Sequence, residues 1–222
     1  MRRLLALIWQ TEFLWHLSRI TPGAPNLANL RARIDQLSPA QMPGTDSAAK
    51  FNRMLAESLR AAVEYLEDDQ GMARADARKA AGAAFLRTGE WSSAALIRLW
   101  LWLDHDPVSS VQQRGLRSSA HCLLGNGMEA DETILPDGVE LRVTQCPFAD
   151  YFWNAARPDL TPILCTWDKG WMEQINAAEC GMSARRDGTI AGGCATCTFT
   201  LRGAAAKEPA GPTPLGLIDR AR

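Results

Sequence analysis

Apolar residues recur every three or four positions through the first half of the chain. Between residues 48 and 69 they include Phe51, Met54, Leu55, Leu59, Ala62, Val63 and Leu66. This spacing predicts an amphipathic helix. The stretch from 73 to 103 predicts one or two further helices, broken near residues 88–90. Residues 1–9 are also expected to be helical, because their apolar run ends at Gln10 and Glu12 without an export cleavage site. We therefore expect a helical region over residues 1–125.

The pattern changes after turn residues near positions 125–127 and 136–138. Residues 139–146 alternate apolar with polar and predict a half-buried strand. Two more strands are expected at 181–190 and 194–202, and a helix at 160–179 that begins around Pro162. The predicted fold class is α+β, a helical N-terminal half followed by a small antiparallel sheet with a packed helix. Residues 126–203 would form the catalytic region, and residues 204–222 are expected to be disordered.

Charge and hydropathy limit the classes of partner. The 24 basic and 25 acidic residues nearly cancel, so the chain has no global positive field to hold nucleic acid. No apolar run approaches the ~20 residues of a membrane span. We therefore expect a cytoplasmic protein with a small-molecule substrate and with neither nucleic acid nor membrane as partner. Assembly into a homo-oligomer stays open.

Cysteine is concentrated late in the chain. Five of the six cysteines follow residue 140, and they are Cys146, Cys165, Cys180, Cys194 and Cys197. Without an export signal these residues are expected to be free thiols. Their distribution indicates that any thiol chemistry lies in the last third of the chain.

Cys165 and Asp168 form the first candidate pair. They are three residues apart in an expected helix, so their side chains share a face. A thiolate is a strong nucleophile, and a neighbouring carboxylate can position water or move a proton. Taken alone, however, the spacing also suits a cysteine that fills the core and an aspartate that is solvated.

The segment 194–197 contains a single C-x-x-C. A structural zinc site needs four ligands, and no histidine follows nearby. Cys146 and Cys165 could complete a site with Cys194 and Cys197. A zinc-binding or ligand-binding module without catalysis therefore stays open as an alternative, although we expect no metal and no cofactor.

Three motifs in this region resemble one known family. They are the strand that ends in Cys146, the helix with Cys165-x-x-Asp168, and the closing strand with Gly192, Gly193, Cys197 and Phe199. In their order and residue types they resemble the L-2-amino-thiazoline-4-carboxylic acid hydrolase family. The resemblance covers roughly residues 141–201.

The resemblance implies a hydrolase that opens a small ring or an amidine-like C–N or C–S bond of an amino-acid-derived substrate. The reaction that names the family opens a thiazoline ring to an N-carbamoyl amino acid. Carried onto this chain, it implies the catalytic residues Cys165, Asp168 and Cys197. A small-ring-forming biosynthetic enzyme on the same scaffold would use the same groups and stays open.

Four further residues are expected to contact the substrate. They are Cys146, Gly192, Gly193 and Arg185, with Arg186 as an alternative to Arg185 for holding a carboxylate. The backbone N–H groups of the two glycines could approach a developing anion. One departure from the family pattern is Thr198, which stands where an acidic residue commonly follows the final cysteine. If that acid takes part in catalysis elsewhere, the activity of this chain either differs or is supported by Asp168 alone.

Overall fold

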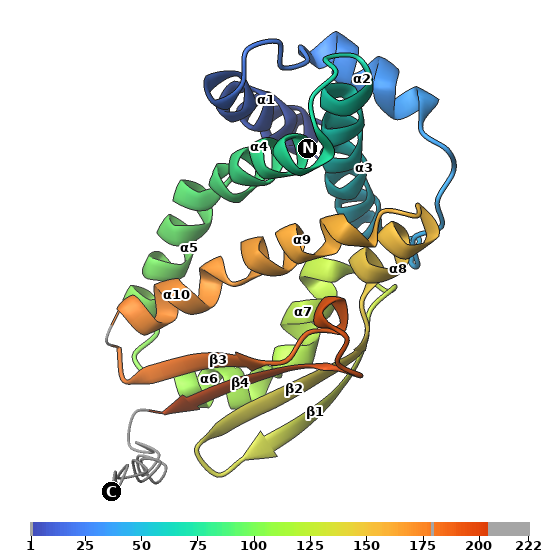
Figure 1. Ribbon diagram of the computed structural model, residues 1–222. Helices are drawn as coiled ribbons and strands as arrows, with labels where there is room; N and C mark the ends of the chain where they lie inside the picture. The colour runs from blue at the N-terminus through green and yellow to red at the C-terminus, as the bar shows by residue number, and fades with distance from the viewer. Residues whose placement is uncertain (1, 179, 204–222) are drawn as a thin grey trace, which may run out of the picture.

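The computed structural model describes residues 2–178 and 180–203 and confirms the α+β class (Figure 1). Helices fill the first half of the chain, and a four-stranded antiparallel sheet follows. The tail predicted to be disordered, residues 204–222, lies outside the described residues. No helix in the described part of the chain has the length and apolar character needed to cross a membrane.

The helical half consists of α1 (Arg2–Ile20), α2 (Leu27–Gln36), α3 (Ser47–Asp68), α4 (Arg74–Arg87), α5 (Glu90–Leu103), α6 (Pro107–Arg114) and α7 (Leu116–Leu124). Local chemistry sets several of these boundaries. The Asp46 carboxylate accepts the N–H of Ala49 and caps the start of α3. Gly89, at φ 73°, adopts the left-handed conformation that separates α4 from α5. The break predicted near residues 88–90 is therefore confirmed.

The first core lies among α1, α3 and α4. Phe13 and Phe85 are fully buried and meet edge to face, with 6.0 Å between their ring centroids. The apolar face of α3 contributes Leu55, Leu59 and Leu66 to the same core. The predicted amphipathic helices thus bury their apolar stripes against one another.

The sheet contains β1 (Glu129–Leu135), β2 (Gly138–Gln145), β3 (Met182–Asp187) and β4 (Cys197–Gly203) in the order β1-β2-β4-β3. β1 was not predicted, because on this edge strand only Ala130 is buried and the alternation is weak. The last strand begins three residues later than predicted. The 3-10 turn η2 (Ile190–Gly192) and Gly193, at φ 90°, take the chain out of the extended conformation.

Short helices connect the sheet to the helical core. They are α8 (Pro147–Asn154), η1 (Pro158–Leu160), α9 (Thr161–Asp168) and α10 (Gly170–Ala177). The predicted helix at 160–179 is therefore divided at Lys169, and α8 was not predicted. Leu164 of α9 packs into the first core, whereas Met172 and Ile175 of α10 pack into the core beneath the sheet. In Figure 1, α9 and α10 run between the helical half and the sheet.

The two faces of the sheet differ in character. Inward-facing residues of β2 and β4 are buried, among them Leu141 and Phe199, which are cross-strand partners. Residues of α5, α6, α7 and α10 pack against this face. On the opposite face, Arg142 and Arg185 are exposed. Side chains of β3 and β4 on this face are therefore covered by helices. The candidate site lies on this covered face.

Candidate functional site

The last turn of α9 brings Cys165 and Asp168 to the edge of the inner sheet face. They lie three residues apart on this helix, as predicted, and both are half-buried. The helix ends at Asp168, so the carboxylate stands where α9 gives way to α10. The residue that contacts this pair from the sheet comes from β3.

Arg186 is the residue of β3 that meets this turn. Alternation along the strand places it on the same face as the buried Met182 and Ala184. Its Nη1 donates to the carbonyl oxygen of Cys165 at 2.8 Å and lies 3.5 Å from Oδ2 of Asp168. The side chain is only 7% exposed. Arg186 is thus a buried cation joined to both members of the predicted pair.

Two aromatic rings, Phe199 and Trp171, lie beside this cation. The guanidinium carbon of Arg186 lies 5.8 Å from the centroid of the Phe199 ring, a cation–π distance. Trp171 stacks on Phe199, with 6.2 Å between the two ring centroids. A side-chain hydrogen bond also joins Trp171 to Asp168. The rings therefore restrict how both charged side chains can be oriented.

Cys197 enters the cluster from the start of β4. It is buried opposite Val143 of β2, and its Sγ accepts the backbone N–H of Ile190 at 3.2 Å. That N–H comes from η2, so this turn covers the thiol. The charge of the Cys197 thiolate raises the pKa of Cys165, so the two residues lie within electrostatic range of one another.

Gly192 and Gly193 shape the η2 turn but are exposed. The N–H of Gly192 is donated to Thr189, and the N–H of Gly193 to the carbonyl of Ile190. These donors are used within the loop. The structure therefore places the glycines as supports of the turn above Cys197, and not with N–H groups directed at a substrate anion.

Cys146 lies between β2 and α8 as the residue before the first turn of the helix. Burial raises the pKa of its thiol to about 12, although the N–H groups of Ala149 and Phe148 act in the opposite direction. The thiols of Cys165 and Cys197 also raise it. The three thiols, which come from separate segments, therefore lie within electrostatic range of one another.

All three thiols are kept protonated near neutral pH. Burial raises the pKa of Cys165 to about 11, with Arg186 opposing the shift and the charges of Cys197 and Asp168 adding to it. Burial also raises the pKa of Cys197. A thiol in this cluster can therefore attack only if a base takes its proton during the reaction.

Asp168 has the properties of such a base. Burial among protein groups raises its pKa to about 6, while Arg186 and the hydrogen bond from Trp171 act to lower it. The side chain nevertheless keeps 37% of its surface open to solvent. The Asp168 carboxyl is thus surrounded in part by protein groups and is still reached by solvent. An acid that titrates near the working pH is suited to proton transfer.

Arg185 and Thr198 lie on the other face of the sheet. Arg185 is exposed and pairs with Asp187, with 3.0 Å between Nη2 and Oδ2. Thr198 is the neighbour of Cys197 in β4 and therefore points away from the cluster. Of the two arginines considered for the substrate carboxylate, Arg186 is the one that reaches the thiols. An acid at position 198 would not face them either.

The remaining cysteine of the C-x-x-C segment, Cys194, is exposed. Within residues 2–178 and 180–203, no group of three or more His, Cys, Asp or Glu side chains has an arrangement that could hold a metal ion. The geometry therefore lends no support to the zinc site of Cys146, Cys165, Cys194 and Cys197.

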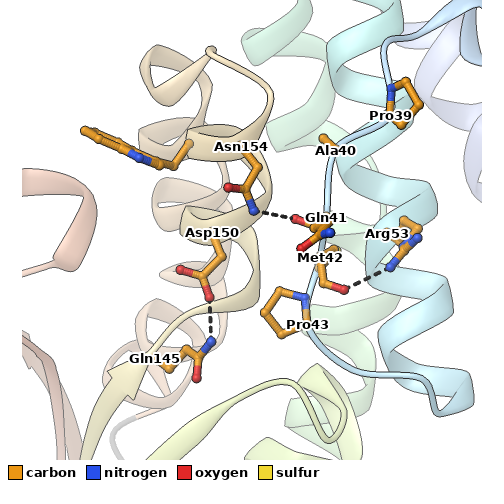
Figure 2. A pocket seen from close by; sticks show the side chains of 10 residues that line it. Pro39, Ala40, Gln41, Met42, Pro43, Arg53, Gln145, Asp150 and Asn154 are labelled. Carbon is orange, nitrogen blue, oxygen red and sulfur yellow. Dashed lines mark hydrogen bonds between the residues drawn. The ribbon is translucent and has the colours of Figure 1, made fainter.

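An open groove of about 730 Å³ lies on the outer side of α8, between that helix and residues 39–43 (Figure 2). Four of its polar side chains, those of Arg53, Gln145, Asp150 and Asn154, are hydrogen-bonded to other protein groups. The amide of Asn154 donates to the carbonyl of Gln41, Arg53 donates to that of Met42, and Asp150 accepts from Gln145. None of the clustered thiols lines it. We therefore place the candidate site at the thiol cluster.

Sequence reasoning named four of the clustered groups directly, Cys146, Cys165, Asp168 and Cys197, and gave Arg186 only as an alternative to Arg185. The choice between the arginines was available in the alternation of Met182, Ala184 and Arg186. Trp171 was not among the predicted site residues. Its position three residues after Asp168 was the missed signal, because Lys169 keeps a helical backbone conformation between α9 and α10, so the i, i+3 spacing still allows contact.

Comparison with known protein families places most of the chain in one family. The model of the L-2-amino-thiazoline-4-carboxylic acid hydrolase family matches residues 53–201. No curated protein and no solved structure matches the chain. The matched region begins in α3 and ends in β4, so it includes most of the helical half as well as the motifs around the thiols.

Proposed function

The chain belongs to the L-2-amino-thiazoline-4-carboxylic acid hydrolase family, and from that premise we propose that it hydrolyses a small amino-acid-derived substrate at the thiol cluster. The bond cleaved would be the C–S or C–N bond of a thiazoline or amidine-like group. The observation that carries the proposal is the contact of one buried guanidinium, Arg186, with both Cys165 and Asp168.

Substrate binding is assigned to Arg186. Its described contacts with Cys165 and Asp168 both use Nη1, and a guanidinium has five N–H donors in a planar fork. Such a fork can hold a carboxylate through two parallel hydrogen bonds. The stacked rings of Trp171 and Phe199 supply flat apolar surface beside it for a small ring.

The first chemical step is assigned to Cys165 and Asp168. The thiol sulfur attacks the sp² ring carbon that bears nitrogen and sulfur, and Asp168 takes the thiol proton. The ring C–S bond then breaks, and Asp168 returns the proton to the departing sulfur. The product of this step is an isothiourea joined to Cys165. The thiol is the more acidic of the two available nucleophiles, because its pKa is about 11 and that of water is about 15.7.

Water completes the reaction in the second step. Asp168 takes a proton from water, the oxygen adds to the isothiourea carbon, and the bond to Cys165 breaks. The thiol regains its proton, and the product is an N-carbamoyl amino acid with a free thiol. One water molecule is consumed and no oxidant is needed. Cys146 and Cys197 remain neutral throughout, because burial raises the pKa of each thiol.

The test is direct incubation of the purified protein with L-2-amino-thiazoline-4-carboxylate. Product is followed by mass spectrometry as the N-carbamoyl amino acid, and separately by titration of the released thiol. We expect turnover by the natural sequence and its loss in Cys165→Ala and Asp168→Asn, with melting temperatures close to that of the natural sequence. Full activity in either variant would overturn the assignment of the pair. The trapped isothiourea, seen as a mass added to the Cys165 peptide after acid quenching, would support the covalent step.

A further inference from the structure

The outer face of α5 is an unpartnered apolar surface in the described part of the chain. Trp91, Ala95, Leu99 and Trp102 recur at helical spacing and form one stripe, and Leu96 and Leu103 lie beside it. The five large side chains are between 50% and 82% exposed. No residue of this 14-residue helix is buried.

The inner side of α5 packs against other residues of its own chain. Ile97, Trp100 and Leu101 pack partly against the core beneath the sheet. α5 also runs alongside α10, and Figure 1 shows it at the outer edge of the molecule. The exposed stripe is therefore a second apolar face on a helix whose first face is satisfied by its own chain. Contiguous apolar surface of this kind marks an interaction site in soluble proteins.

From this face we infer that the protein forms a dimer in which the outer stripe of α5 packs against the same stripe of a second copy. The two tryptophans and three leucines present roughly 600 Å² of surface. Two copies would then bury about 1,200 Å² in total, which reaches the lower bound of specific interfaces. Tryptophan is also the residue type most enriched at the energetic centres of interfaces.

The order of residues along the stripe fits a two-fold contact. Tryptophan stands near each end, at positions 91 and 102, and Leu96 and Leu99 lie between them. In an antiparallel arrangement, Trp91 of one copy meets Trp102 or Leu103 of the other, over a span of about 16 Å. The leucines then meet near the axis, so the surface is complementary to itself as a two-fold interface requires.

Charge also favours a second copy over a charged partner. The stripe contains no acidic residue and no lysine, and Arg98 lies at its edge. Two such faces approach without repulsion across most of the contact. An anionic lipid surface would instead attract a helix rich in basic residues on its polar side.

Sedimentation velocity over a range of protein concentrations tests the inference. We expect a dimer for the natural sequence and a monomer for the double variant Leu99→Glu with Trp102→Glu. The matched control is Leu123→Glu on α7, another highly exposed leucine outside the stripe, which should stay dimeric. A monomeric natural sequence, or a double variant that still dimerises, would overturn the proposal. Binding of the natural sequence, as a monomer, to vesicles of anionic lipid would also overturn the proposal.

A charge-swap experiment separates direct contact from misfolding. Leu99→Glu and Leu99→Lys should each be monomeric, with circular dichroism spectra like that of the natural sequence. Mixed in equal amounts, they should form a dimer, because opposite charges near the two-fold axis attract. A mixture that stays monomeric would show that the two α5 helices do not meet at this position.

Discussion

Arg186 and Asp168 form an ion pair across the junction of β3 and α9, with 3.5 Å between Nη1 and Oδ2. The same nitrogen donates to the carbonyl oxygen of Cys165. A strand residue thus fixes the turn that bears both the acid and the thiol. Despite its cationic neighbour, the pKa of Asp168 is raised to about 6, because burial outweighs the attraction of the guanidinium. The predictions below follow from this arrangement.

The first prediction concerns pH. Asp168 acts as a base only when ionised, so kcat/KM should fall about tenfold for each pH unit below about 6 and level off above it. Asp168→Asn should lose about 10²- to 10⁴-fold in kcat and show no inflection in this range. Rates measured between pH 4.5 and 8.5 in overlapping buffers test both statements. A natural enzyme with a flat profile from pH 5 to 7 would contradict the role of Asp168.

The second prediction compares two neighbouring arginines. Arg186→Lys keeps the positive charge but loses the planar fork, so KM should rise at least about tenfold, which corresponds to about 1.4 kcal/mol. Arg185→Ala removes an exposed side chain on the opposite sheet face and should leave KM unchanged. Steady-state kinetics with a carboxylate substrate and with its amide would check the interpretation. The difference between the two arginines should vanish with the amide.

An equal effect of the two arginine substitutions would contradict the assignment. It would mean that the substrate carboxylate is bound outside the thiol cluster. A fall in kcat at unchanged KM in Arg186→Lys would instead assign to Arg186 the positioning of Asp168, because the ion pair would then be its main contribution.

Much of the fold followed from periodicity. The helices at α3 and α4 were predicted from apolar spacing, and Gly89 divided α4 from α5 as expected. β1 was missed because an edge strand with one buried side chain has almost no alternation to detect. The division of the helix at Lys169 was missed, although Gly170 follows it and glycine is unfavourable inside a helix. Packing of α9 on one core and α10 on another separates them.

The sequence identified most of the site residues, but it did not reveal how they are arranged in space. The positions of Cys165 and Asp168 on one helix face follow from their spacing. Their meeting with Cys146 and Cys197 depends on strand order and on the placement of α9, which a local pattern does not encode. The choice of Arg186 over Arg185 required only the period of a strand, once the register of β3 was known.

The third prediction concerns thiol reactivity. Cys122 and Cys194 are exposed, whereas burial raises the pKa of Cys146 to about 12 and that of Cys165 to about 11. At pH 7.5, iodoacetamide should therefore modify Cys122 and Cys194 first and Cys146 last, since the thiolate is the reacting form. Peptide mass spectrometry over a time course measures the order. Unfolded protein is the control, in which the differences should disappear. Early modification of Cys146 in the folded protein would contradict its burial.

The fourth prediction concerns the departure from the family pattern at Thr198. This residue pairs in register with Arg142 and Asp187 and points to the outer face, away from Cys197. Thr198→Asp should therefore change kcat and KM by less than about twofold, because a charge there is screened by solvent. Cys197→Val is the matched variant on the inner face. It removes the sulfur that accepts the N–H of Ile190, so it should weaken the η2 turn and lower kcat. A large gain in activity from Thr198→Asp would show that the acid common in the family reaches the reaction from this face, and that Asp168 is not the base.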